Sequence, residues 1–100
     1  MARFSAGQIV EHQKFGYRGV IFAVDEVFAL TDEWYDNVAR SRPPRDRPWY
    51  HVLVDGADHT TYVAQRHLEP SQDCSQIEHP LLGEWFDRYD GQRYRPRAGG

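Results

Sequence analysis

The sequence contains very little sulfur and no long apolar run. Cys74 is the single cysteine among 100 residues, so no intrachain disulfide can form, and a disulfide-stapled secreted scaffold is excluded. The longest uninterrupted apolar run, residues 20–24, is far too short for a membrane helix. Residues 1–15 contain no apolar run of signal-peptide length. We therefore expect a cytoplasmic protein in a reducing compartment, with no membrane partner.

The chain also lacks net positive charge. Lys14 is the single lysine among 12 cationic side chains, 15 side chains are acidic, and the formal net charge is −3. Non-specific binding to nucleic acid depends on concentrated cations that release counterions from the phosphates. A nucleic-acid contact would therefore need a local basic face. The arginines suit such a face, but they suit salt bridges to carboxylates equally well.

Patterns typical of catalytic and metal sites are missing as well. The histidines and Cys74 lack the close spacings of zinc modules, although His51 and His59 flank a predicted hairpin turn and could face each other across it. Cys74 follows the acidic Asp73, which disfavours a reactive thiolate. The sequence has neither a nucleophile elbow nor a glycine-rich phosphate loop. We expect no enzymatic activity, no metal and no cofactor.

Residues 7–25 carry the strongest structural signal. Two runs rich in β-branched residues flank a segment that is interrupted by Gly16 and Gly19, a pattern typical of a β-hairpin. The predicted strands are residues 8–13 and 17–25, and both have apolar side chains on both faces. Burial on both faces favours either a small closed barrel or a contact between copies of the chain.

A short helix is predicted between strands, at about residues 32–41. Thr31 is a suitable N-cap, and Asp32 and Glu33 fall in the first turn, where the helix dipole favours anions. The prolines that follow cannot continue a helix. The other predicted elements are strands at 48–55 and 59–64 joined by a turn at Gly56, a helical turn at 65–68, and a last short strand from residue 68 or 69.

The composition changes at Cys74. Residues 1–73 hold the predicted strands, so we expect them to form a mainly β domain, a small barrel of about five strands with the helix inserted. In residues 74–100, four apolar side chains follow a helical stripe: Leu81, Leu82, Trp85 and Phe86. The chain ends in a basic segment and a Gly-Gly pair. We expect a C-terminal extension that is partly docked and has a mobile end.

Two basic segments are candidate binding sites. At the tip of the first hairpin, Lys14, Tyr17 and Arg18 combine cations with a ring that could stack on bases, although the ring could equally cap the barrel end. The linker at residues 40–47 contributes four more cations, which are Arg40, Arg42, Arg45 and Arg47. This linker could contact phosphates or an acidic partner, or it could be a solvated connection.

The order and spacing of several short motifs resemble those of a known family. The matching motifs are Val10-Glu11-His12, Phe15-Gly16-Tyr17-Arg18-Gly19-Val20, Val24-Asp25, Glu33-Trp34-Tyr35, Pro48-Trp49-Tyr50-His51-Val52-Leu53, Tyr62-Val63-Ala64, Leu68-Glu69-Pro70, His79-Pro80 and Tyr94-Arg95-Pro96. They cover about residues 5–97. In these motifs the chain resembles the HspQ, or YccV-like, family of hemimethylated-DNA-binding proteins.

The resemblance implies an SH3-like β-barrel with an inserted helix, assembled as a homotrimer. It also implies binding to hemimethylated double-stranded DNA, and a heat-shock role around the Lon protease as a substrate and as an enhancer of the degradation of other substrates. It supplies no catalytic residue. Two functions stay open: a DNA-binding module that uses Lys14, Arg18 and residues 40–47, or a protease adaptor that uses protein contacts. The net charge of −3 favours the adaptor.

Overall fold

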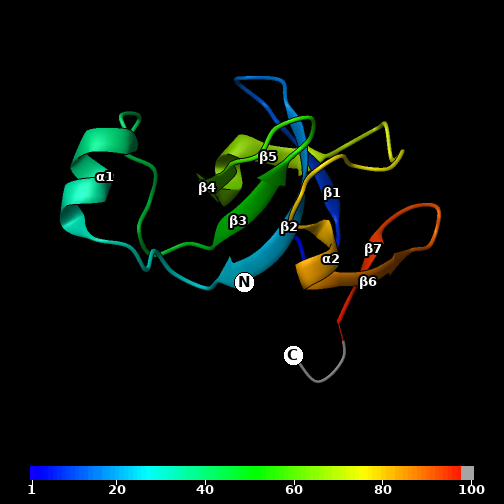
Figure 1. Cartoon of the computed structure of the whole chain (residues 1–100). Coiled ribbons are helices and arrows are strands. Elements are labelled where there is room, and N and C mark those ends of the chain that lie inside the picture. The colour runs from blue at the N-terminus through cyan, green and yellow to red at the C-terminus, as the bar shows by residue number, and fades with distance from the viewer. Residues whose placement is uncertain (98–100) are drawn as a thin grey trace.

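The computed structural model describes residues 1–97 and shows a mainly β fold (Figure 1). Five strands form an antiparallel sheet in the order β4-β3-β2-β1-β5, and β6 pairs with β7 in a second, two-stranded sheet. The strands are β1 Ile9–His12, β2 Arg18–Asp25, β3 Trp49–Val54, β4 Thr60–Ala64, β5 Leu68–Pro70, β6 Phe86–Tyr89 and β7 Tyr94–Pro96. The helices are α1 Asp32–Val38, the 3-10 turn η1 Gln65–His67 and α2 Leu82–Trp85. The predicted fold class is confirmed, and the sheet is consistent with an SH3-like barrel.

Strand β2 explains why the first hairpin is apolar on both faces. Val20 and Ile21 point to opposite faces, and both side chains are fully buried. Ile21 packs with Tyr50 in the core enclosed by the curved sheet, whereas Val20 packs with Phe86 on the other face. The register of β2 against β3 shifts between Ile21 and Ala23, which bends the strand. Both apolar faces of β2 are thus buried within one chain.

The C-terminal segment packs against the outer face of the sheet. Ile77, Phe86 and Tyr94 are buried there against Ile9 and Leu53. The β6–β7 hairpin was not predicted, and the expected helical stripe is correct only for α2, after which the chain becomes extended at Phe86. The local helical spacing was misleading because Phe86 is buried through a strand rather than a helix. The predicted mobile end falls in part on residues 98–100, which lie outside the described residues.

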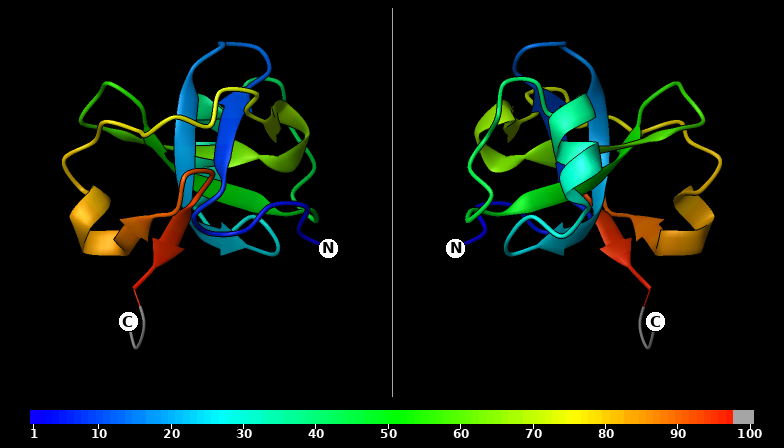
Figure 2. Two further views of the ribbon diagram at one scale, coloured as in Figure 1. Left: turned by 90° about the vertical axis from the view of Figure 1, so that its right-hand side faces the viewer. Right: turned by 90° about the vertical axis from the view of Figure 1, so that its left-hand side faces the viewer.

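The inserted helix lies at the opposite end of the sheet from this hairpin (Figures 1 and 2). Thr31 is the N-cap as predicted, because its hydroxyl accepts the Trp34 N–H at 3.1 Å. The helix ends at Val38, earlier than predicted, because Ala39 leaves the helical conformation. Tyr35 packs against Trp49 and fixes α1 on the sheet. None of the helices in residues 1–97 has the length and apolarity that a membrane crossing requires.

Candidate functional site

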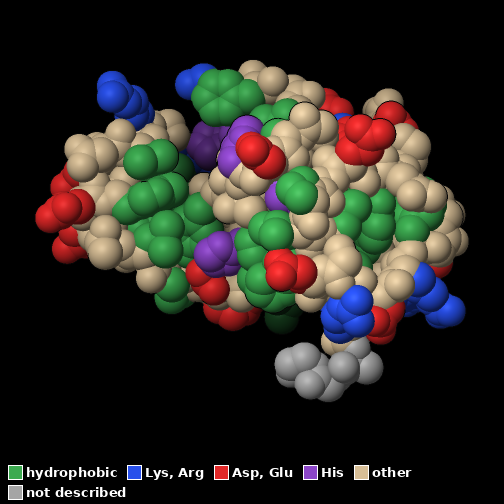
Figure 3. Space-filling view, in the orientation of Figure 1, with side chains coloured by type: hydrophobic (Ala, Val, Ile, Leu, Met, Phe, Trp, Pro, Cys, Tyr) green, Lys and Arg blue, Asp and Glu red, His purple; other side chains and the backbone are tan. Residues whose placement is uncertain are grey.

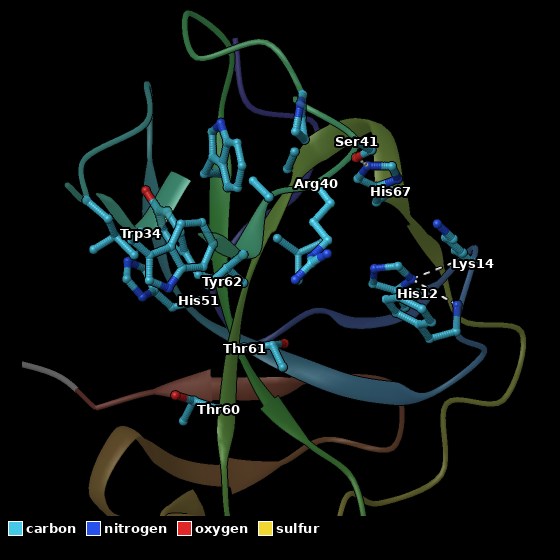
Figure 4. Close-up of a pocket in the computed structure, with 18 of the residues that line it drawn as sticks. His12, Lys14, Trp34, Arg40, Ser41, His51, Thr60, Thr61, Tyr62 and His67 are labelled. Carbon is cyan, nitrogen blue, oxygen red and sulfur yellow. Dashed lines mark hydrogen bonds between the residues drawn. The ribbon is translucent and has the colours of Figure 1, made fainter. Parts of the chain in front are cut away.

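A groove of about 660 Å³ runs along β4, between α1 and the turn that joins β1 to β2 (Figure 4). All five β4 residues line it. Trp34 and Arg40 come from α1 and the loop after it, and Lys14 and Tyr17 come from the turn. In Figure 3, hydrophobic and histidine side chains gather between α1 and the sheet, and the cationic side chains lie towards the edges. Such a surface is suited to a ligand that is partly apolar.

His12 closes the turn at one end of this groove. Its Nδ1 accepts the backbone N–H groups of Lys14 and Phe15, each at 3.1 Å. The His12 ring stacks on the rings of Phe15 and His67, with centroid distances of 4.6 and 5.7 Å. Burial, followed by the charges of His67 and Lys14, lowers the pKa of His12. Burial also lowers the pKa of His67, helped by Arg66 and Lys14. Both imidazoles are therefore held in the neutral form.

The turn is expected to lose stability in acid because of His12. A histidine pKa below its ordinary value of about 6.5 means that the unfolded chain binds the proton more readily than the folded chain. The contribution of neutral His12 to the free energy of unfolding is therefore complete above about pH 6.5. It is lost as the pH falls towards the lowered pKa of His12. Protonated Nδ1 can no longer accept the two N–H groups. Urea unfolding across a pH series measures this loss.

His12→Asn is the matched control for the acid effect. The Asn Oδ1 can accept the same two N–H groups, but it does not titrate. This variant should lose less unfolding free energy than the natural chain between neutral and mildly acidic pH, and the remaining loss reports on His67 and other groups. An identical loss in both proteins would contradict a role for His12.

Asp25 orders the other end of the groove. Its Oδ2 accepts the Tyr62 hydroxyl at 2.7 Å and lies 3.0 Å from Nε2 of His51. Burial and the nearby Asp25 raise the pKa of Tyr62, so the phenol stays protonated. Ala29 donates its N–H to the same phenol oxygen at 3.1 Å. Residues 1–97 contain no group of three or more potential metal ligands. The arrangement rigidifies a binding surface.

The three hairpin-tip candidates are divided between two places. Lys14 is exposed at the groove rim, and Tyr17 lines the groove with its hydroxyl 2.8 Å from that of Thr61. Arg18 does not line the groove. Its guanidinium donates to Asp55 at 3.0 Å and to the backbone oxygens of residues 73, 75 and 76 at 2.7, 2.9 and 3.3 Å. The position of Arg18 thus has a structural explanation, the attachment of the 73–76 segment to the sheet.

The four linker arginines are also separated. Arg42 pairs with Asp36 at 3.3 Å, and Arg45 pairs with Asp32, so both are held by carboxylates of α1. Arg40 lines the groove. Arg47 lines a second, smaller pocket of about 270 Å³. Sequence proximity suggested one cluster, but the loop after α1 directs these side chains to different neighbours.

Three of the residues that line the smaller pocket are arginines, and we call Arg3, Arg47 and Arg66 the arginine patch. Within residues 1–97, no carboxylate lines this pocket. Among residues 1–97, none of the three guanidinium groups forms an ion pair, although Arg66 donates to the Ser41 carbonyl at 3.0 Å. Ala64 lines both pockets, so the arginine patch and the groove are adjacent. Sequence reasoning missed two members because isolated arginines at the N-terminus and in η1 carry no local signal.

Comparisons with known proteins point to one domain type. A family model described as "Hemimethylated DNA-binding protein YccV like" matches residues 2–93. Among curated proteins, "F-box only protein 21" of Pongo abelii and of Homo sapiens is 33% identical over 97 residues, and that of Mus musculus is 32% identical. Each alignment covers 95% of this chain but 15–16% of the relative. The chain thus spans less than a fifth of the length of these relatives.

Proposed function

Because the chain belongs to the YccV-like family of hemimethylated-DNA-binding proteins, we propose that it binds hemimethylated double-stranded DNA through the arginine patch. The observation that carries the proposal is a set of three arginines that line one pocket, with no carboxylate among the lining residues of the described part of the chain. Arginine binds phosphate oxygens in a bidentate fork, and release of counterions supplies affinity. A local patch of this kind reconciles DNA binding with a net charge of −3. The activity is binding and not catalysis.

Arg40 and Lys14 extend this interface along the groove rim, next to the arginine patch. Arg42 and Arg45 are compensated by Asp36 and Asp32, and Arg18 is occupied by the 73–76 segment. We therefore assign the DNA contact to Lys14, Arg40 and the arginine patch, and leave the compensated arginines out of it. Phosphate contacts position a duplex but do not distinguish methylated bases. Specificity for the hemimethylated state is a separate property and needs its own comparison.

Replacing Arg3 and Arg47 together by alanine is expected to weaken binding to hemimethylated DNA. Each lost phosphate contact should reduce the slope of log K against log salt by about 0.9, and should cost roughly tenfold in affinity near 0.1 M salt. Fluorescence anisotropy of a labelled duplex across a salt series measures both quantities. The matched control is the double variant of Arg88 and Arg95, which removes the same charge from the β6–β7 hairpin.

The two variants distinguish a site from a general charge effect. Equal losses in both would contradict the arginine patch as the contact, because net charge alone would then explain them. Competition with unmethylated and fully methylated duplexes tests specificity. Equal affinity for all three duplexes would leave DNA binding in place and remove the preference for the hemimethylated state.

A second candidate function is modulation of the Lon protease through protein contacts. It is favoured by the apolar groove, where Phe15 and Val38 are exposed beside β4. The test is degradation of a model substrate by purified Lon with the full chain and with a chain that lacks residues 91–100. Unchanged degradation rates in both mixtures would remove this candidate.

The homotrimer is likewise a proposal, which sedimentation of the purified chain tests directly.

A further inference from the structure

Strand β4 has an open edge that faces the groove. It is the outermost strand of the five-stranded sheet and pairs on one side with β3. The Val54 N–H donates to the backbone oxygen of His59, and the Gln65 N–H donates to the backbone oxygen of Pro48. Because hydrogen-bonded and non-bonded pairs alternate in an antiparallel ladder, the bonded pairs between them are Val52–Thr61 and Tyr50–Val63. The backbone groups of Thr60, Tyr62 and Ala64 therefore point away from β3.

The outward backbone groups of Thr60 and Tyr62 have no partner among the described residues, whereas Ala64 leads into the 3-10 turn η1. Within residues 1–97, no hydrogen bond outside the β3 ladder engages the backbone of Thr60 or Tyr62. The groove receives side chains from both faces of β4, with Thr61 and Val63 on one face and Tyr62 on the other. Figure 4 shows β4 running down the middle, with Trp34 and His51 on one side and His12 and Lys14 on the other. The groove thus follows the strand edge itself.

The walls of the groove define the chemistry of an occupant. Phe15, Leu30 and Val38 are exposed apolar side chains beside the edge. In the described part of the chain, Lys14 and Arg40 are the two permanent cations of the lining, and no carboxylate belongs to it. An unpaired strand edge between apolar walls suits an extended backbone, with alternate side chains of the added strand facing the walls. The cations without lining carboxylates favour an acidic segment.

We propose that the open edge of β4 is a strand-addition site for an extended, acidic segment of another protein. The segment pairs its backbone with Thr60 and Tyr62, places apolar side chains against the groove walls, and directs carboxylates to Lys14 and Arg40. The proposal goes beyond DNA binding, because backbone pairing at this edge does not use the arginine patch, although the acidic segment and DNA would share Lys14 and Arg40. A variant that blocks the edge but keeps Lys14, Arg40 and the arginine patch should therefore leave DNA affinity unchanged.

A synthetic peptide provides the probe. It is a blocked segment of alternating valine and threonine, flanked at both ends by aspartate, and its binding to the full chain is followed by Trp fluorescence and amide hydrogen exchange. Binding should protect the Thr60 and Tyr62 amides, which face the groove. The same peptide with lysines in place of the aspartates should bind about tenfold more weakly or worse, because lysines meet Lys14 and Arg40. N-methylation of the peptide at alternate residues should abolish binding.

Thr60→Pro blocks the edge without breaking the β3 ladder. The Thr60 N–H points outward, and proline is tolerated on an edge strand at such a position. Removal of this donor and the bulk of the ring should weaken peptide binding about tenfold. Thr60→Val keeps the N–H and is the matched control, with expected affinity close to that of the natural chain. The melting temperatures of both variants verify that the fold is retained.

The possible outcomes separate the occupants of the edge. Equal peptide affinity of Thr60→Pro and Thr60→Val, with both folded, would overturn strand addition. Equal affinity of the aspartate and lysine peptides would overturn the acidic segment. If the chain self-associates and Thr60→Pro dissociates it, the occupant is a second copy and the proposal is wrong about the partner. Loss of DNA affinity in Thr60→Pro would show that DNA contacts the strand edge itself as well as Lys14 and Arg40 at the rim, and would overturn the separation of the two sites.

Discussion

Replacing Gly7 with alanine is expected to lower the free energy of unfolding by about 3–5 kcal/mol, the combined cost of left-handed strain and steric overlap. Gly7 has a φ of +94°, which disfavours any residue with a Cβ. An added Cβ would also lie 2.0 Å from the backbone oxygen of Tyr94. The Gly7 N–H donates to Ile21 at 2.7 Å, and the Tyr94 N–H donates to the Gly7 oxygen at 2.9 Å. At Gly7 the backbone of β7 thus lies directly against the backbone that leads into the sheet, and no space is left for a side chain.

Chemical denaturation measures the effect, and Gly56→Ala is the matched control. Gly56 has a φ of +76°, but no atom lies within 4 Å of an added Cβ. Its substitution should therefore cost about 1–2 kcal/mol, the left-handed strain alone. Hydrogen exchange at Tyr94 and Ile77 should rise further in Gly7→Ala than the global loss of stability explains, because the hairpin detaches first. Equal losses in the two variants would contradict the close approach of Gly7 to β7.

Arg18→Ala is expected to lower the free energy of unfolding by about 2–4 kcal/mol, because it removes one partner of an ion pair that is largely shielded from water. The Arg18 side chain is 15% exposed and its partner Asp55 is 26% exposed. Removal of the guanidinium leaves the Asp55 carboxylate without its ion-pair partner. It also leaves three backbone oxygens of the 73–76 segment without their donor. The segment between β5 and α2 should then separate from the sheet.

Arg42→Ala provides the contrast within the same chain. Arg42 and Asp36 form an ion pair at 3.3 Å whose side chains are 65% and 64% exposed. Exposed pairs of this kind contribute about 0–1 kcal/mol. Urea denaturation of both variants, with a double-mutant cycle on Arg18 and Asp55, isolates the coupling energy. A cost for Arg18→Ala no larger than that for Arg42→Ala would contradict a structural role for Arg18.

Local sequence patterns predicted the first half of the fold well. The strands β1 to β4, the N-cap at Thr31 and the helical turn before β5 were all predicted within a few residues. In each case the signal is local, because β-branched runs, a capping hydroxyl and Asp55-Gly56 turn chemistry act over a few neighbouring residues. The β6–β7 hairpin was missed because its burial depends on Ile9 and Leu53, which are far away along the chain.

The candidate site was predicted less well, for a related reason. The position of Lys14 at the groove rim follows from the hairpin turn. The roles of Arg18 and Arg45 depend on carboxylates and carbonyls brought from other segments, so their availability could not be read from neighbouring residues. The arginine patch joins Arg3 and Arg66, which no local pattern connects.

The amino-acid sequence by itself determined a mainly β domain with an inserted helix and two-sided apolar strands, because residue periodicity and capping act between near neighbours. Its motifs also established the resemblance to the YccV-like family. The tertiary structure alone decided which cations are compensated, where the arginine patch lies and that the edge of β4 is open. These properties are set by distances between residues remote in sequence, and folding creates those distances only when the strands pair and the helix packs.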